Sequence, residues 1–403
     1  MRAPKVPFTL HGAVHPRASH DVAEGITASL HPDGRTAALI TGRYGRGTLQ
    51  FLDLSTGALT DVLPGRTALQ HVVWAASGER WAAAGECDQG GALYVGERGR
   101  AELLHELTTP TYGTSLRNDL AYPSPVLALS PDGARVVMRS IHDYGERSTL
   151  YHLDVATGDL RAQPLDPDEG HPYAQGFRAD GAVVTLCASP GDTSGMAVYE
   201  RGGDRVIARL QHVAGYVLVP STRGLWALGL PRYGHHVAPG KAIAASACHH
   251  DRVERVERLA ARARSTWDKQ HVAWLTQQVA KKAVPFGYDV TARSGRAGTT
   301  PPPTEGARSY ENMLYWDTAR AARWRDDDVI VSDGIAVWRW HEDGRGLRQD
   351  LLVDDPQHAT HRTARILAVS VAGDTLALLW KRDAGGAKTV LTRFDIDPAL
   401  VTG

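Results

Sequence analysis

Short alternations of apolar and polar residues recur along this chain in units that keep the same internal order. The clearest pair is residues 27–57, TASLHPDGRTAALITGRYGRGTLQFLDLSTG, and residues 126–158, VLALSPDGARVVMRSIHDYGERSTLYHLDVATG. Each stretch predicts three short strands, with a tight Pro-Asp-Gly turn after the first and an Asp-x-x-Thr-Gly turn after the third. The chain therefore contains a repeated β unit.

The glycine of the first turn, or its equivalent, marks this repeat along the whole chain. Successive marks lie 43 to 55 residues apart, except for one gap of 104 residues. The marks are Gly34, Gly78, Gly133, Gly181, Gly224, Asp328 and Gly373. A period in the forties with about four strands per unit is typical of a β-propeller, in which each blade packs between its neighbours. The long gap holds either two blades or one blade with a large insertion.

The pattern predicts an all-β fold: a single propeller domain over residues 1–403, with seven blades of four antiparallel strands, or six blades as the alternative. The last blade has only three predicted strands, in RILAVSVA, TLALLWKR and KTVLTRFDID. Residues 6–13, VPFTLHGA, alternate in the way required of its fourth strand. We expect this N-terminal strand to close the ring, which removes the exposed strand edges that favour aggregation.

Residues 251–307 interrupt the β pattern after the fifth blade. Apolar residues recur at three- and four-residue spacing from Val253 to Val279, which predicts an amphipathic helix. Such a helix can pack against the rim of the propeller or serve as a docking element for a partner. Residues 291–307 are rich in Gly, Pro and Thr and predict a loop. We therefore expect a helical and loop insertion within the domain.

Composition supports this fold and restricts the partners. The 403 residues exceed the usual size of one compact core, and 41 glycines with 22 prolines suit many short strands joined by turns. The 45 basic residues balance 45 acidic residues, so the chain lacks the excess positive charge typical of proteins that bind nucleic acid or anionic membranes. We predict no nucleic-acid partner and no membrane partner.

The cysteines and the N-terminus favour a cytoplasmic location. Cys87, Cys187 and Cys248 are odd in number, widely spaced and without a C-x-x-C pair, which argues against a disulfide framework. The N-terminus has no apolar run of seven or more residues, and no window elsewhere approaches 18 apolar residues without charge. We therefore expect the protein in the cytoplasm.

The turn motifs resemble those of the TolB-like and WD40-like propellers. The matching residues are Ser-Pro-Asp-Gly at 130–133, His-Pro-Asp-Gly at 31–34, and Leu-Asp-x-x-Thr-Gly at 52–57 and 153–158. The Trp-Asp dipeptide of true WD40 repeats is replaced by Leu-Asp, or by Phe-Asp at 394–395, which is closer to the TolB and prolyl-oligopeptidase type. The resemblance covers nearly the whole chain apart from the insertion. It implies the fold and little about function, because these propellers act as scaffolds, ligand binders, protease gates and occasionally enzymes.

The chain lacks the common motifs of hydrolases, nucleotide-binding loops and zinc proteases, since G-x-S-x-G, the P-loop and H-E-x-x-H are all absent. Residues 248–251, Cys-His-His-Asp, offer four side chains that can bind metal. Adjacent residues of a strand face opposite sides, so at most two of the four could share one ion, and Asp251 is well placed to cap a helix. We predict no catalytic residue, no metal site and no cofactor.

The candidate binding residues lie in the connection between the second and third strands of three blades. This connection reads GRYGRG at 42–47, HDYGER at 142–147 and PRYGHH at 231–236. Equivalent connections share one face of a propeller, so the three Tyr-Gly pairs would ring the mouth of the central channel. The candidates are Arg43, Tyr44, Arg46, His142, Asp143, Tyr144, Arg147, Arg232, Tyr233, His235 and His236. The alternative is that each Tyr-Gly is a turn inherited with the repeat, whose ring covers a neighbouring blade.

Tyrosine and arginine are enriched among binding hot spots, so we interpret this face as a docking surface for a protein or peptide. The favoured function is a non-catalytic binding or scaffold protein, with residues 251–307 as a second contact element. The alternative is a propeller enzyme of the lactonase or lyase kind, with its active site at the central channel. A third interpretation is a subunit of a larger assembly in which the propeller only spaces other components.

Overall fold

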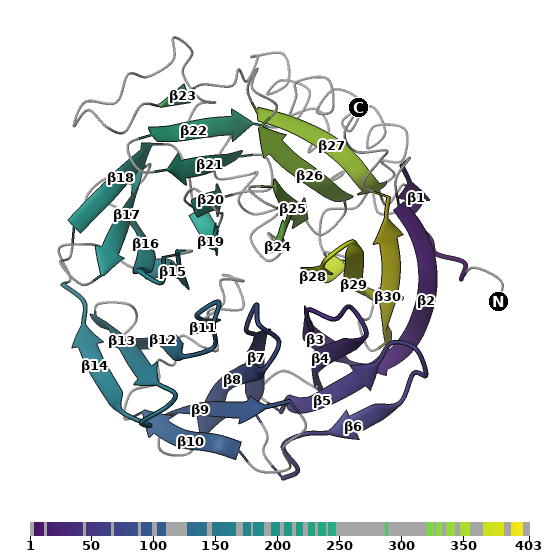
Figure 1. The fold of residues 1–403 in the computed structure, drawn as a ribbon, viewed down its shortest axis with the longest axis horizontal. Coiled ribbons are helices and arrows are strands. Elements are labelled where there is room, and N and C mark those ends of the chain that lie inside the picture. The colour runs from purple at the N-terminus through teal and green to yellow at the C-terminus, as the bar shows by residue number, and fades with distance from the viewer. Residues whose placement is uncertain are drawn as a thin grey trace, which may run out of the picture.

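The structure is a ring of antiparallel sheets that stand around a common axis (Figure 1). No helix occurs in the part of the chain that the structure describes. The helix and loop predicted within residues 251–307 lie outside that part, apart from the short strand at 287–288. The computed structural model describes residues 4–11, 14–42, 46–65, 68–87, 90–98, 103–109, 127–142, 147–166, 172–178, 180–188, 195–201, 205–211, 215–220, 225–229, 233–238, 241–246, 287–288, 320–325, 328–332, 336–342, 347–354, 366–382 and 388–397.

The first four sheets along the chain each contain four consecutive strands, and in each sheet the first strand lies nearest the axis and the last lies at the rim (Figure 1). The first sheet holds β3 (Gly25–Leu30), β4 (Thr36–Thr41), β5 (Thr48–Asp53) and β6 (Leu59–Asp61). The second holds β7 (Leu69–Trp74), β8 (Arg80–Cys87), β9 (Gly90–Glu97) and β10 (Leu103–Thr109). The third holds β11 (Leu127–Leu129), β12 (Arg135–His142), β13 (Arg147–Asp154) and β14 (Leu160–Pro164). The fourth holds β15 (Pro172–Phe177), β16 (Val183–Ala188), β17 (Gly195–Arg201) and β18 (Arg205–Gln211).

Three further sheets complete the ring, and two of them carry a fifth strand at the outer edge. The fifth sheet holds β19 (Gly215–Pro220), β20 (Leu225–Gly229), β21 (Tyr233–Ala238), β22 (Lys241–Ser246) and the added β23 (Gly287–Tyr288). The sixth holds β24 (Arg320–Trp324), β25 (Asp328–Ser332), β26 (Ala336–Glu342), β27 (Leu347–Asp354) and the added β1 (Thr9–Leu10). The seventh holds β28 (Ile366–Ala372), β29 (Thr375–Lys381), β30 (Lys388–Ile396) and β2 (Val14–Ala23). The expected all-β fold is confirmed, while the innermost strand β24 was missed by the sequence pattern.

The two ends of the chain meet in the seventh sheet. β2 pairs with β30 along its whole length, starting from Val14 opposite Ile396, so an N-terminal strand closes the ring as expected. The prediction that residues 6–13 form this strand is wrong, because β1 within them pairs with β27 of the preceding sheet. Only Val14 and Val22 of β2 are buried. This outermost strand therefore lacks the apolar alternation on which the prediction relied.

The second strands of the first and seventh sheets are almost completely buried. In β4 every residue after Thr36 is buried, and in β29 every residue before Lys381 is buried. A strand in this place is covered on both faces, because each sheet of the ring lies between two neighbours. Leu39 of the first sheet and Leu379 of the seventh belong to one core cluster, which fills the interface beside the closing strand.

The repeated turns form as predicted. Asp33 accepts a hydrogen bond of 2.8 Å from the backbone N–H of Arg35, and Gly34 has a φ of +66°. Asp53 binds the backbone in the same way in the second kind of turn, where Gly57 has a φ of +78°. Positive φ favours glycine, since a side chain would be strained there. These local hydrogen bonds fix the ends of the strand hairpins.

Candidate functional site

The three Tyr-Gly motifs fall at equivalent places along three sheets. The first lies between β4 and β5 and the second between β12 and β13, while the third begins between β20 and β21 and continues into β21. Residues 43–45, 143–146 and 230–232 are outside the described residues. The placement of the candidates within these segments stays a prediction. These candidates are Arg43, Tyr44, Asp143, Tyr144 and Arg232.

Three other candidates flank these segments. Arg46 is exposed shortly before β5 begins. His142 and Arg147 lie opposite each other at the end of the pairing between β12 and β13. The backbone thus holds His142 and Arg147 beside the segment that contains the second motif, although their side chains are outside the described part of the structure.

The loop predicted for residues 231–236 is shorter in the structure. Tyr233, His235 and His236 belong to β21, where Tyr233 pairs with Ser246 of β22. β20 ends at Gly229, so only three residues connect it to β21. The loop prediction is wrong for these three residues, because the backbone pairs with both neighbouring strands over most of the motif.

The opposite ends of the sheets carry a series of contacts between neighbours. The turn between the first and second strands of one sheet bonds to the same turn of the next sheet. The donor and acceptor pairs are His31 with the carbonyl of Gly78 (2.8 Å), Arg80 with that of Gly133 (3.1 Å), and Arg135 with that of Gly181. These bonds fix successive turns relative to one another, which gives a rigid frame for the loops at the other face.

Asp33 contacts two basic side chains at the joint between the first and second sheets. Its carboxylate lies 2.9 Å from Nδ1 of His31 and 2.6 Å from Nη2 of Arg98. Burial raises the pKa of Asp33, but hydrogen bonds from the Arg35 amide, Arg98 and His31 outweigh it and lower this pKa to about 2. The ring of His31 meets the ring of Trp74 edge to face, with centroids 4.7 Å apart. This polar cluster therefore joins two sheets.

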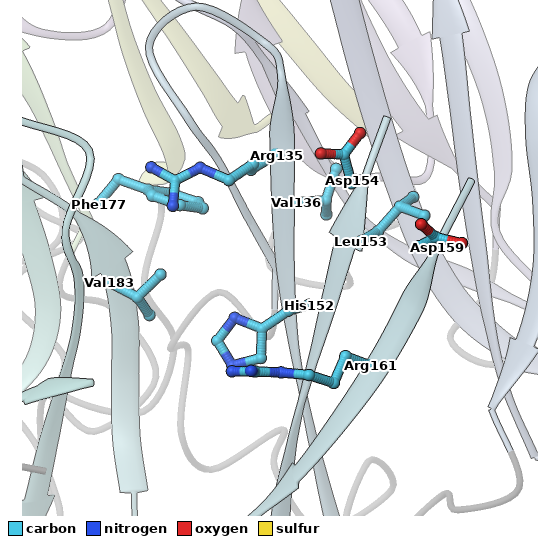
Figure 2. A pocket seen from close by; sticks show the side chains of 9 residues that line it. All are labelled: Arg135, Val136, His152, Leu153, Asp154, Asp159, Arg161, Phe177 and Val183. Atoms are coloured by element: carbon cyan, nitrogen blue, oxygen red, sulfur yellow. The ribbon is translucent and has the colours of Figure 1, made fainter. Parts of the chain in front are cut away.

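A cavity of about 270 Å³ lies between the third and fourth sheets. The third sheet contributes Arg135 from β12, His152 from β13 and Arg161 from β14, and the fourth sheet contributes Phe177 and Val183 (Figure 2). The polar side chains come from three strands of one sheet and face the apolar side chains of the next. No sequence motif marks this site, because its residues come from separate strands of two sheets.

His152 contributes an imidazole to the lining of this cavity. Its Nε2 lies 2.9 Å from Oε1 of Gln163. Burial is the largest effect on the pKa of His152 and lowers it, whereas the hydrogen bond with Gln163 raises it by less; the positive charges of Arg161 and then Arg135 lower it further. The imidazole is therefore neutral at pH 7.

The two arginines give this side of the cavity a positive charge. The guanidinium carbon of Arg135 lies 5.4 Å from the centroid of the Phe177 ring. Figure 2 shows the guanidinium group of Arg161 next to the ring of His152. Within the described ranges, neither Arg135 nor Arg161 forms an ion pair with a carboxylate. The positive charges are thus not neutralised by those parts of the chain.

Two aspartates also line the cavity, but their carboxylates point away from His152 (Figure 2). Asp154 begins the turn after β13, where it accepts hydrogen bonds of 2.9 Å and 3.1 Å from the amides of Ala156 and Thr157. Asp159 follows the same turn. The negative charge of Asp154 is therefore directed at the turn backbone.

Metal ligands do not cluster in the described ranges: no group of three or more His, Cys, Asp or Glu side chains there could hold an ion. Residues 248–251, which offer four such side chains in sequence, lie outside those ranges. None of the described residues forms a helix of the length and apolar character needed to cross a membrane.

The arrangement of sheets is that of a β-propeller, and solved structures of low sequence identity share it. A chain in the crystal structure of the mitotic checkpoint complex matches with a TM-score of 0.52 and 11% identity, covering 98% of both chains. The β-propeller domain of Cps50 (Swd1) from Myceliophteria thermophila matches with a TM-score of 0.50 and 11% identity, over 97% of this chain and 100% of that domain. TolB from Acinetobacter baumannii gives a TM-score of 0.36 and 12% identity, over 90% of this chain and 64% of that one.

At these identities the likeness concerns the fold alone. The resemblance to propellers that the turn motifs indicated is confirmed at that level. The sequence matches no protein-family model and no curated protein.

Proposed function

We propose that this protein is a non-catalytic β-propeller of the cytoplasm, which binds a protein or peptide partner on the face that carries the Tyr-Gly connections. Tyr44, Tyr144 and Tyr233 supply the aromatic contacts of this face. The charged neighbours, Arg43 and Arg147 among them, supply hydrogen bonds and set the charge that a partner meets. The protein acts alone as a binding module or as one subunit of a larger assembly.

One observation carries the proposal: the Tyr-Gly motifs recur between the second and third strands of the first and third sheets and at the start of the third strand, β21, in the fifth sheet. Innermost strands of a propeller all run in the same direction, so equivalent connections open onto the same face. Three identical Tyr-Gly pairs on alternate blades are thus expected around one end of the ring. Residues presented by loops on a rigid frame are well suited to recognition.

The similar solved structures are consistent with a binding role. One match is a chain within a protein complex, and another is a propeller domain taken from Swd1. Neither match identifies a partner for this chain. They support the coarser idea that a propeller of this shape takes part in protein assemblies.

A triple substitution tests the proposal. Changing Tyr44, Tyr144 and Tyr233 together to Ala in the full chain should abolish capture of the partner from the source cells. The free energy of unfolding should change by less than about 1 kcal/mol, since exposed side chains contribute little to stability. The control is Leu59→Ala, an exposed apolar side chain in β6 that is 43% accessible, which should leave capture intact.

The same experiment distinguishes the alternative role of the tyrosines. If their rings cover neighbouring blades, the triple variant loses several kcal/mol of stability, as expected for buried aromatic side chains. That result, or undiminished capture by the triple variant, would overturn the proposed function.

A further inference from the structure

The interface between the first and second sheets shows how the repeat normally fills the space beside its third strand. The ring of Phe51 in β5 lies 5.1 Å from the ring of Trp74 and 6.0 Å from that of Trp81, measured between centroids. His152 in β13 holds the position of Phe51 in the third sheet. Both residues stand two positions before the aspartate of the Asp-x-x-Thr-Gly turn. One repeat therefore places a phenylalanine where the other places a histidine.

The residues opposite this position also differ between the two interfaces. Trp74 pairs with Trp81 where β7 meets β8, and Phe177 pairs with Val183 at the same place between β15 and β16. Phe177 and Val183 are smaller than the two tryptophans. The space that aromatic rings fill between the first two sheets is thus a cavity of about 270 Å³ between the third and fourth sheets. The arginines and aspartates of its lining are exposed, so this cavity is open to solvent.

Basic side chains replace the missing apolar groups. Arg161 lies opposite His152 in β14, whereas the corresponding residue opposite Phe51 in the first sheet is Thr60. Arg135 adds a second guanidinium group from β12, next to the Phe177 ring. The cavity therefore combines an apolar wall with two positive charges that have no carboxylate partner among the described residues.

We propose that this cavity binds a carboxylate group attached to a short apolar body. The guanidinium group of Arg161 has the planar donor geometry that matches a carboxylate. Arg135 brings a second positive charge to the same space, and the apolar body of the ligand packs against Phe177 and Val183. A pocket with an apolar wall and a few convergent polar groups is the usual design of a ligand site.

The charges around His152 favour binding of the ligand carboxylate next to Arg161. The third sheet presents Arg135 and Arg161 there, and the described residues of the fourth sheet that line the cavity are the uncharged Phe177 and Val183. Arg178 and Asp180, in the first turn of the fourth sheet, pair with each other. The two aspartates of the cavity lining point away from His152 (Figure 2). A bound carboxylate counteracts the two guanidinium charges, so binding should raise the pKa of His152 toward or above its ordinary value and should tighten as the pH falls.

This site is distinct from the face that carries the Tyr-Gly connections. Arg135 follows the turn between the first and second strands of the third sheet, and Asp159 precedes the fourth strand. Both positions are at the end of the sheet opposite to the connection between β12 and β13. The cavity therefore offers a second recognition site, and its existence does not depend on the function proposed for the first.

The test follows the imidazole resonances of His152 by NMR in the full-length protein. Isovalerate is the free-acid probe. A short peptide with blocked termini and one free glutamate side chain is the polypeptide probe, and inorganic phosphate is the comparison anion. We expect a saturable shift with at least one carboxylate probe at millimolar concentrations, together with a rise in the pKa of His152. Tighter binding of isovalerate identifies a small free acid as the source, and tighter binding of the peptide identifies an acidic side chain.

Variants decide whether the cavity is responsible. Arg161→Gln should weaken carboxylate binding roughly ten-fold or more, because it removes a charge-assisted hydrogen bond. Arg35→Gln removes one exposed arginine from the turn before β4 in the first sheet, which does not line the cavity, and should leave binding unchanged. His152→Phe restores the aromatic residue of the first repeat, so it should remove binding while the protein stays folded. Binding to this variant is measured by titration calorimetry, beside the wild-type protein, because the variant lacks the imidazole that reports binding by NMR.

Three results would overturn the inference. The first is the absence of any saturable shift with either carboxylate probe in the wild-type protein. The second is an equal loss of binding in Arg161→Gln and Arg35→Gln, which would indicate a general effect of charge. The third is a phosphate affinity that exceeds that of both carboxylates. A thermal unfolding curve for each variant confirms that a loss of binding does not come from a loss of fold.

Discussion

Nε2 of His31 donates a hydrogen bond of 2.8 Å to the carbonyl oxygen of Gly78 and so joins the first sheet to the second. His31 is only 5% accessible, and its ring is held against Trp74. The contact leaves no room for a side chain on the partner. A Cβ atom at position 78 would lie 2.7 Å from Nε2 of His31.

Gly78→Ala should therefore destabilise the protein more than an alanine at an otherwise similar glycine. Gly65 is the matched control, because its φ of +77° is nearly that of Gly78 at +76° and no atom lies within 4 Å of the place that a Cβ would take. The positive φ should cost each variant about 1 kcal/mol. Gly78→Ala should lose roughly 1–3 kcal/mol more, because the new methyl group must displace His31. Urea unfolding of both variants measures the difference. Equal losses of unfolding free energy would show that the contact between His31 and Gly78 does not stabilise the protein.

Asp33 makes the same joint sensitive to acid. Its folded-state pKa of about 2 lies below the ordinary value of 3.8, so the unfolded chain binds the proton more readily. The stabilisation is therefore present above pH 3.8 and is lost as the pH falls from there toward 2. Asp33→Ala should cost about 1 kcal/mol at pH 6, through the lost hydrogen bonds to the turn and to Arg98.

The pH dependence provides the check on this assignment. The difference in unfolding free energy between wild type and Asp33→Ala should shrink as the pH is lowered through the range from 3.8 toward 2. A difference that stays constant over this range would mean that the charge of Asp33 does not stabilise the joint.

Ring closure by β2 gives a third prediction. Val22 is 3% accessible and packs in the same core cluster as Leu391 of β30. Val22→Ala should cost roughly 1–3 kcal/mol, because it removes buried apolar volume beside the closing strand. Leu10→Ala should cost less, since Leu10 is only partly buried at the edge of the sixth sheet. The opposite order in denaturant unfolding would favour residues 6–13 as the closing strand.

The sequence predicts those parts of the fold whose cause is local. Asp33 and Gly34 form their turn through hydrogen bonds within a few residues, and the positive φ of Gly34 favours glycine. The repeated turn can therefore be recognised from the sequence. The apolar stretch of β4 is equally clear, because burial on both faces requires it. β2 was misplaced since an outermost strand needs few apolar residues, and only Val14 and Val22 are buried.

The cavity could not be predicted from sequence motifs, for a different reason. His152 and Val183 belong to different sheets, and only the ring brings them to the same space. A comparison of the repeats does carry a signal, because His152 stands where the first repeat has Phe51. The repetition of the Tyr-Gly motifs is evident in the sequence. The sequence does not show how far each strand extends into its motif, and Tyr233 lies in β21 rather than in the loop.

The binding face is the central claim, and site-specific photo-crosslinking in the source cells tests it most directly. A photoreactive amino acid replaces Tyr44, Tyr144 or Tyr233, one position at a time, in the full-length chain. Control positions are Thr56 and Ala156, which are exposed in the turns at the opposite ends of the sheets. The account predicts that the same protein is crosslinked from all three tyrosine positions and from neither control. Crosslinks of equal yield from Thr56 and Ala156, or none from the tyrosine positions, would contradict it.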